Sequence, residues 1–238
     1  MSTKTDILFI IDESGSMNCM GDEPINSVNQ FIESQKEIDS KNTNITIVKF
    51  NDKVNTIVNK VPIDEFKGLT KNDYTPNCTT SLYDAIVSTI KTEIDEETEE
   101  ESKKIFVIIT DGVENTSKIY TLTDVKEYVH TAENTHGWKI IFCGANIDSF
   151  EEGSNMKMST TRCANFDQSI PGNLFGLCRS ISECVSDYRR NDTEELTLRS
   201  FSSPVKSTIT PTTPTESKQS IDLNQITPPL PSFFSLRL

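Results

Sequence analysis

The stretch Asp6–Met17, "DILFIIDESGSM", decides how this chain folds and where its chemistry lies. A continuous apolar run, residues 7–11, is typical of a β-strand that is covered on both faces. The run ends at Asp12, and Ser14 and Ser16 follow at alternate positions around Gly15. A buried strand that ends in oxygen-bearing side chains indicates a loop that holds a nucleophile, a phosphate or a metal ion.

The composition narrows the class of protein. The chain has 238 residues, enough for one large domain or two small ones, and 34% of them are hydrophobic. That share is low for a wholly globular chain and predicts that part of it lies outside the core. The net charge is −13, and the sequence contains no run of Lys or Arg. Nucleic acid is therefore not an expected partner.

The sequence also predicts where the protein works. The apolar run near the N-terminus is too short for a signal peptide, and no stretch approaches the roughly 18 apolar residues that span a bilayer. Six cysteines are scattered without a C-x-x-C pair, which favours reduced thiols over a zinc site or disulfides. We expect a cytoplasmic protein without a membrane segment.

Apolar strands alternate with amphipathic helices up to about residue 190. The expected strands are 5–11, 44–50, 53–61, 103–110 and 138–144, and the expected helices are 23–38, one from about Ser81, 123–137 and 174–188. This alternation predicts an α/β fold, a doubly wound and mostly parallel sheet with helices on both faces. The 44–61 hairpin is expected to add one antiparallel edge strand. We expect the 123–137 helix to begin with Thr123 as its N-cap and to close at Gly137.

Residues 191–238 differ in character from the rest. They hold six of the ten prolines, many Ser and Thr, and no apolar periodicity, which is typical of a disordered tail. The predicted organisation is thus a domain over 1–190 and a tail over 191–238. The tail ends in "PPLPSFFSLRL", which is either a solubilising extension or a docking peptide with an apolar end.

Oxygen donors outside the opening stretch complete a pattern. Thr79 and Thr80 precede the helix that begins near Ser81, and Asp111 follows the 103–110 strand. In a parallel α/β sheet, ligands bind beyond the carboxyl ends of the strands, where the loops at 12–16 and 111–112 are expected to lie. Mg²⁺ prefers oxygen ligands of this kind. The pattern therefore indicates a magnesium site.

The three elements "DESGS", "TTSLYDA" and "TDG" resemble, in order and spacing, the metal-ion-dependent adhesion site of the von Willebrand factor A domain. The resemblance covers roughly residues 3–190. "LTKNDYTPN" and "FCGANIDSFEEG" resemble the stand-alone intracellular A domains of bacteria, phages and large viruses, the second as their final-strand segment. The resemblance implies a Rossmann-like fold.

The resemblance also implies a ligand set and a function. Hydroxyl oxygens of Ser14, Ser16 and Thr80 would hold Mg²⁺ or Mn²⁺, and Asp12 and Asp111 would take part directly or through water. A partner protein would supply an Asp or Glu carboxylate to the ion, so the chain would be a binding module and not an enzyme.

One departure from the family pattern leaves the threonine open. Cys78 stands where these domains usually have a glycine, two residues before the metal-binding threonine. Thr79 is therefore an alternative to Thr80 as the ligand.

Other functions fit the residues less well. The serines do not lie in a G-x-S-x-G elbow, and His130 and His136, the two histidines, are expected far from the strand tips. Phosphoryl transfer through Asp12 would need a second acid where Ser14 stands, and there is no phosphate-binding G-x-x-x-x-G-K-[ST] loop. A further alternative is an A-domain scaffold that has lost its metal, in which Ser16 merely caps a helix.

Overall fold

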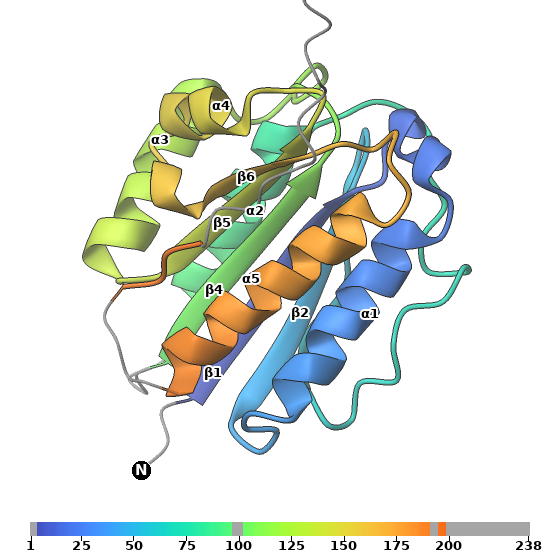
Figure 1. Cartoon of the computed structure of the whole chain (residues 1–238). Coiled ribbons are helices and arrows are strands. Elements are labelled where there is room, and N and C mark those ends of the chain that lie inside the picture. Colours follow the sequence, from blue (N-terminus) through green and yellow to red (C-terminus); the bar gives the residue numbers. More distant parts are fainter. Residues whose placement is uncertain (1–3, 97–101, 191–194, 199–238) are drawn as a thin grey trace, which may run out of the picture. The chain divides into compact units, whose positions relative to one another are not determined.

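A computed structural model describes residues 4–96, 102–190 and 195–198 of the chain (Figure 1). Its centre is a six-stranded sheet with the strand order β3-β2-β1-β4-β5-β6. The strands are β1 (Lys4–Asp12), β2 (Thr43–Phe50), β3 (Val54–Pro62), β4 (Ser102–Thr110), β5 (Lys139–Ala145) and β6 (Cys163–Phe166). All neighbouring strands are parallel except the antiparallel pair β2–β3 at one edge. The predicted α/β class and the antiparallel edge strand are confirmed.

Helices cover both faces of this sheet, as the alternation predicts. Helices α1 (Glu23–Lys36) and α5 (Asn173–Arg190) lie side by side on one face, and α2 (Leu82–Asp95) and α3 (Leu122–His130) lie on the other (Figure 1). The shorter elements are α4 (Ser149–Asn155), the 3-10 turns η1 (Gly15–Met20) and η3 (Thr160–Arg162), and the π-helical turn η2 (Thr131–Thr135).

The opening apolar run is continuous because β1 is buried on both faces. Ile7, Phe9 and Ile11 belong to the core under α1 and α5, and Leu8 and Ile10 belong to the core under α2 and α3. All five side chains are at most 2% exposed. Strand β1 is thus fixed from both sides, and so is the loop that follows Asp12.

Helix α3 begins two residues earlier than predicted. Its N-cap is Thr121 and not Thr123. The Thr121 hydroxyl accepts a hydrogen bond from the Asp124 backbone N–H, and the Asp124 carboxylate accepts one from the Thr121 N–H at 2.7 Å. This reciprocal capping box needs an acid three residues after the cap, and Asp124 stands in that position only for Thr121. The chain turns out of this region at Gly137, whose φ is +68°.

The sheet extends one strand beyond the last predicted one. Strand β6 pairs in parallel with β5, so 138–144 is not the final strand and "FCGANIDSFEEG" does not end the sheet. Helix α4 lies between β5 and β6 and was also not expected. With four and seven residues, β6 and α4 are too short for their periodicity to stand out in the sequence.

Of the four described residues in the expected tail, Leu196 and Leu198 lie against the domain. Leu196 is 1% exposed and belongs to the core under α5, and the Leu198 backbone N–H donates to the Thr161 carbonyl at 3.0 Å. The rest of the predicted tail, 191–194 and 199–238, lies outside the described residues, so the boundary at 190 stays a prediction. In the part of the chain that the structure describes, no helix is both long enough and apolar enough to cross a membrane.

Candidate metal centre

The neighbouring strands β1 and β4 bring two aspartates together at the carboxyl ends of the strands. Asp12 is the last residue of β1, and Asp111 follows the last residue of β4. The two strands are parallel, so their carboxyl ends meet. Asp12 is 0% exposed and Asp111 is 3% exposed. Two buried carboxyl groups therefore lie at the adjacent carboxyl ends of β1 and β4.

The Asp12 carboxylate is oriented by two hydrogen bonds. Its Oδ1 accepts from the Ser14 backbone N–H at 2.7 Å, and its Oδ2 accepts from the Thr110 hydroxyl at 2.6 Å. Burial raises the pKa of the Asp12 carboxyl from 3.8 to about 6, although these hydrogen bonds act in the opposite direction. The protein thus holds a carboxylate in a place where its charge is disfavoured.

Serine hydroxyls connect the two aspartates. Ser14 Oγ lies 3.1 Å from Ser16 Oγ, and the Ser16 hydroxyl donates to Asp111 Oδ1 at 2.7 Å. Ser14 is buried and Ser16 is exposed, so the group reaches the solvent at Ser16. The hydroxyl oxygens of Ser14 and Ser16 in "DESGS" therefore lie within hydrogen-bond distance of each other.

The Asp111 carboxylate shows whether a cation would fit this group of residues. Its Oδ2 is buried and has no hydrogen-bond partner among the described residues. Burial also raises the pKa of the Asp111 carboxyl. A buried carboxylate oxygen without a donor is unfavourable unless a cation satisfies it. The donor set of hydroxyls and carboxylates fits a hard divalent cation such as Mg²⁺.

The structure places Thr80, and not Thr79, beside these groups. Thr80 is 3% exposed, and a β-carbon built on Gly112 would lie 3.7 Å from its hydroxyl oxygen. Its backbone N–H donates to Asn115 Oδ1 at 3.0 Å. Thr79 is exposed, and its hydroxyl accepts from Thr116 at 3.0 Å. Of the two threonines, Thr80 is therefore the buried one that lies near Gly112 and Asp111.

Cys78 occupies a backbone conformation that suits glycine. Its φ is +62°, in the left-handed region that L-residues with a β-carbon rarely adopt. The carbonyl of Cys78 accepts from the Gly15 N–H at 3.1 Å, which joins the two loops. The chain therefore forms a left-handed turn with a cysteine at the position where the resemblance implies a glycine.

Sequence reasoning missed the residues that orient the ligands. Thr110 holds Asp12, and Asn115 binds the Thr80 backbone. Thr110 directly precedes Asp111, so its place at the strand end was a usable signal. Asn115 lies in an irregular loop, where no periodicity points to its side chain.

The two histidines lie near the amino-terminal ends of the strands, whereas the serines lie at the carboxyl ends. His130 ends α3, and His136 lies beside Trp138, just before β5 begins, with 4.8 Å between ring centroids. Within the described residues, no group of three or more His, Cys, Asp or Glu side chains is placed to hold a metal. A metal centre at the carboxyl ends of β1 and β4 would therefore depend on hydroxyl oxygens as well as on the two aspartates.

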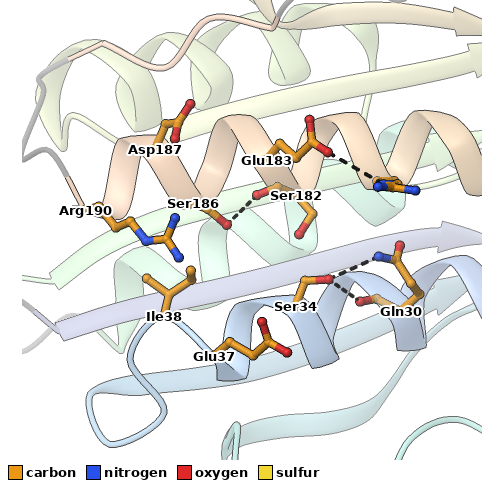
Figure 2. Close-up of a pocket in the computed structure, with 10 residues that line it drawn as sticks. Gln30, Ser34, Glu37, Ile38, Ser182, Glu183, Ser186, Asp187 and Arg190 are labelled. Atoms are coloured by element: carbon orange, nitrogen blue, oxygen red, sulfur yellow. Dashed lines mark hydrogen bonds and ion pairs between the residues drawn. The ribbon is translucent and has the colours of Figure 1, made fainter.

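A separate cavity of about 480 Å³ lies between α1 and α5 (Figure 2). Figure 2 shows that its side chains come from the later turns of α1 and α5 and from Glu37 and Ile38, which follow α1, toward the amino-terminal ends of the parallel strands. Several of them already bond one another, such as Ser34 to the Gln30 carbonyl and Ser186 to the Ser182 carbonyl. Beneath the cavity, the buried Gln35 Nε2 donates to Ser182 and Ser186. We read this region as a polar contact between helices.

Comparisons with known proteins agree with this fold. The sequence model of the von Willebrand factor type A domain matches residues 6–174. Among solved structures, the chain is similar to the PilB minor pilin from Streptococcus sanguinis, with a TM-score of 0.63 and 12% identity over 81% of this chain and 64% of the pilin. It is also similar to a manganese-loaded TRAP protein from Plasmodium vivax, with a TM-score of 0.52 and 16% identity over 71% of this chain and 70% of that one.

A third similar structure is a von Willebrand factor type A protein from Catenulispora acidiphila, with a TM-score of 0.54 and 11% identity over 77% of this chain and 43% of that one. At such identities the likeness shows the fold alone. The chain spans less than two thirds of the length of the pilin and of this protein. No curated protein matches the sequence.

Proposed function

Because its sequence matches the family model over residues 6–174 and its fold agrees, this chain belongs to the von Willebrand factor type A domain family, and we propose that it is a metal-dependent protein-binding module. Domains of this family typically bind protein partners and are not enzymes. A manganese-loaded structural neighbour is consistent with a divalent metal in the family.

The proposed metal centre consists of Asp12, Ser14, Ser16, Thr80 and Asp111, and it takes Mg²⁺ or Mn²⁺. The single observation that carries this proposal is the buried Asp111 Oδ2, which has no donor in the described structure and lies in a group of hydroxyls and carboxylates. When bound, the ion would supply an open coordination position that attracts an anionic oxygen. The chain's own residues orient that position, because Thr110 and the Ser14 N–H fix Asp12.

We propose that the partner supplies an Asp or Glu carboxylate. The ion would be the positive centre of a chain whose net charge is −13, so acidic partners are repelled unless a carboxylate reaches the ion. Specificity would then come from the geometry of that one carboxylate.

The surroundings of the centre favour an apolar residue beside the carboxylate. Four large hydrophobic side chains are exposed in the described part of the chain: Val113 at 53%, Ile119 at 73%, Phe150 at 46% and Phe175 at 38%. All four lie on segments that follow the carboxyl ends of β4, β5 or β6, which is the end of the sheet that holds the candidate metal centre. Exposed apolar side chains that share one edge are typical of a binding surface.

The proposed setting is the cytoplasm, and the proposed activity is binding alone. All six cysteines are free in the structure, as a reducing compartment would keep them. The histidines lie away from Ser14 and Ser16, so no histidine general base adjoins either serine.

A displayed peptide library, captured on the immobilised chain with Mg²⁺ and eluted with EDTA, tests this function. We expect enrichment of peptides with an Asp or Glu next to a large apolar residue. Thr80→Val is expected to abolish capture, whereas Thr79→Val, a change at the exposed neighbouring residue, is expected to leave it intact. Enriched peptides without an acid, or capture that EDTA does not reverse, would refute the proposal.

A further inference from the structure

Glu13 lies between Asp12 and Ser14, and the metal centre alone does not explain why its side chain is buried. It is 4% exposed, and its Oε1 lies 2.9 Å from Lys49 Nζ on β2. The same Oε1 accepts from the Thr75 backbone N–H at 2.6 Å. Asp12 reaches Thr110 on β4, on one side of β1, whereas Glu13 reaches β2, on the other side. Glu13 thus faces the segment that leads to Thr80.

That segment, residues 70–80, is called the threonine loop here. It contains neither helix nor strand, so no regular hydrogen-bond pattern fixes its position. Its contacts converge on Glu13 and the neighbouring residues. Lys49 Nζ donates to the Asp73 carbonyl at 2.9 Å, the Tyr74 hydroxyl donates to the Asp12 carbonyl at 2.6 Å, and the Asn77 N–H donates to the Glu13 carbonyl at 2.9 Å.

Glu13 and Lys49 therefore connect three parts of the molecule. Their ion pair is partly shielded from water, with side-chain exposures of 5% for Glu13 and 19% for Lys49. Both partners also bind the threonine loop, Glu13 through the Thr75 N–H and Lys49 through the Asp73 carbonyl. Loss of either charge leaves the other without its partner and loosens the loop.

We propose that Glu13 and Lys49 are a positioning pair that sets the metal affinity of the chain by holding the threonine loop, and thereby Thr80, against Asp12–Ser16. This inference rests on the proposed function. Neither residue contacts the ion. A loop that must be ordered upon metal binding lowers the apparent affinity by the fraction of time that it is correctly placed. Substitution of residues that orient metal ligands typically weakens metal binding by about 10- to 100-fold.

Three variants and a matched control test the pair. Glu13→Gln keeps an oxygen for the Thr75 N–H but removes the charge, Lys49→Met removes the cation, and Lys49→Arg retains it. The control is Lys104→Met, in a second buried ion pair in which Lys104 Nζ lies 2.6 Å from Glu93 Oε2. That pair joins α2 to the beginning of β4, at the end of the strand far from Asp111.

Three readouts separate positioning from general stability. The first is the Mg²⁺ dissociation constant by calorimetry, and the second is the midpoint of urea unfolding. The third is hydrogen exchange of the Thr75 and Asn77 amides in the metal-free protein. We expect Glu13→Gln and Lys49→Met each to raise the dissociation constant about 10- to 100-fold and to speed exchange at both amides. Lys49→Arg is expected to stay within about threefold of wild type.

The control is expected to lower the unfolding midpoint without changing the dissociation constant or the loop amides. Should Glu13→Gln prevent folding, Tyr74→Phe removes one contact of the same loop and is expected to raise the dissociation constant to a smaller extent. An unchanged dissociation constant in Lys49→Met, or an equal rise in Lys104→Met, would overturn the inference. If wild type binds no Mg²⁺, the proposed function fails, and unchanged loop exchange in the metal-free variants would then overturn the positioning role as well.

Discussion

Replacing Asp12 with asparagine is expected to stabilise the metal-free protein while it removes the affinity for Mg²⁺. Asp12 is fully buried, and burial raises the pKa of its carboxyl from 3.8 to about 6. The asparagine amide can keep the contacts, because its oxygen can accept from the Ser14 N–H. Its NH₂ can donate to the Thr110 hydroxyl, which itself can donate to the Gly112 carbonyl 3.1 Å away.

The size of the effect follows from the two pKa values. A difference of one unit between the folded-state and unfolded-state pKa corresponds to about 1.4 kcal/mol. Because the pKa of Asp12 rises from 3.8 to about 6, the ionised carboxylate lowers the free energy of unfolding by roughly 3 kcal/mol. The folded-state pKa is the higher one, so the folded chain binds this proton more tightly than the unfolded chain does. Below about pH 4 the carboxyl is protonated in both states and the destabilisation vanishes. It grows between about pH 4 and 6 and is complete above about pH 6.

Urea unfolding in EDTA, at about pH 4 and about pH 7.5, measures this effect. Asp12→Asn is expected to gain roughly 3 kcal/mol at the higher pH and little at the lower one. Added Mg²⁺ should then raise the stability of wild type and leave the variant unchanged. Asp64→Asn, at an exposed aspartate after β3, serves as the control and should change neither value. A metal-free variant that is less stable than wild type at pH 7.5, or equally stabilised at both pH values, would contradict the reasoning.

Three further outcomes are expected. Cys78→Gly should raise the free energy of unfolding by up to about 1 kcal/mol, because φ is +62°, whereas Cys78→Val should lower it; equal stabilities in urea would refute the strain argument. A thiol reagent should label Cys19 and Cys78 quickly and the four buried cysteines slowly, since burial also raises the pKa of Cys178 to about 12; six equal rates would count against the packing. Gln35→Met should lower the free energy of unfolding by about 2 kcal/mol, because Arg189 Nη1 loses Gln35 Oε1 at 2.8 Å and keeps only the Gln35 backbone carbonyl at 3.0 Å, with no change in Mg²⁺ affinity; a weakened affinity would speak against a purely structural role.

The sequence predicted those parts of the fold whose signal is repeated along an element. Strand β1 could be placed because its five apolar residues are buried by cores on both faces. Strand β6 could not, because its four residues, "CANF", carry too little pattern. The Thr121 cap was misplaced because Thr121 and Thr123 are both plausible caps until the position of Asp124 relative to each is considered.

The candidate site was predictable in part for a similar reason. Asp12, Ser14 and Ser16 lie on one short loop, and a parallel sheet brings Asp111 to the same edge. The spacing in the family pattern pointed to Thr80 with Thr79 as an alternative, and only the structure shows that Thr80 is buried and Thr79 is exposed. The role of Glu13 required contacts with Lys49 and Thr75, which are 36 and 62 positions away in the chain. Spacing within a motif does not reveal such contacts.

The most direct test of the metal centre is a calorimetric titration of Mg²⁺ into chelator-stripped protein, with wild type and Asp12→Ala compared. Wild type is expected to bind one ion per chain with measurable heat, and Asp12→Ala is expected to bind none, because the ligand loop loses the carboxylate that holds Ser14. Equal and negligible heats in both proteins would contradict the account, and so would equal binding in both.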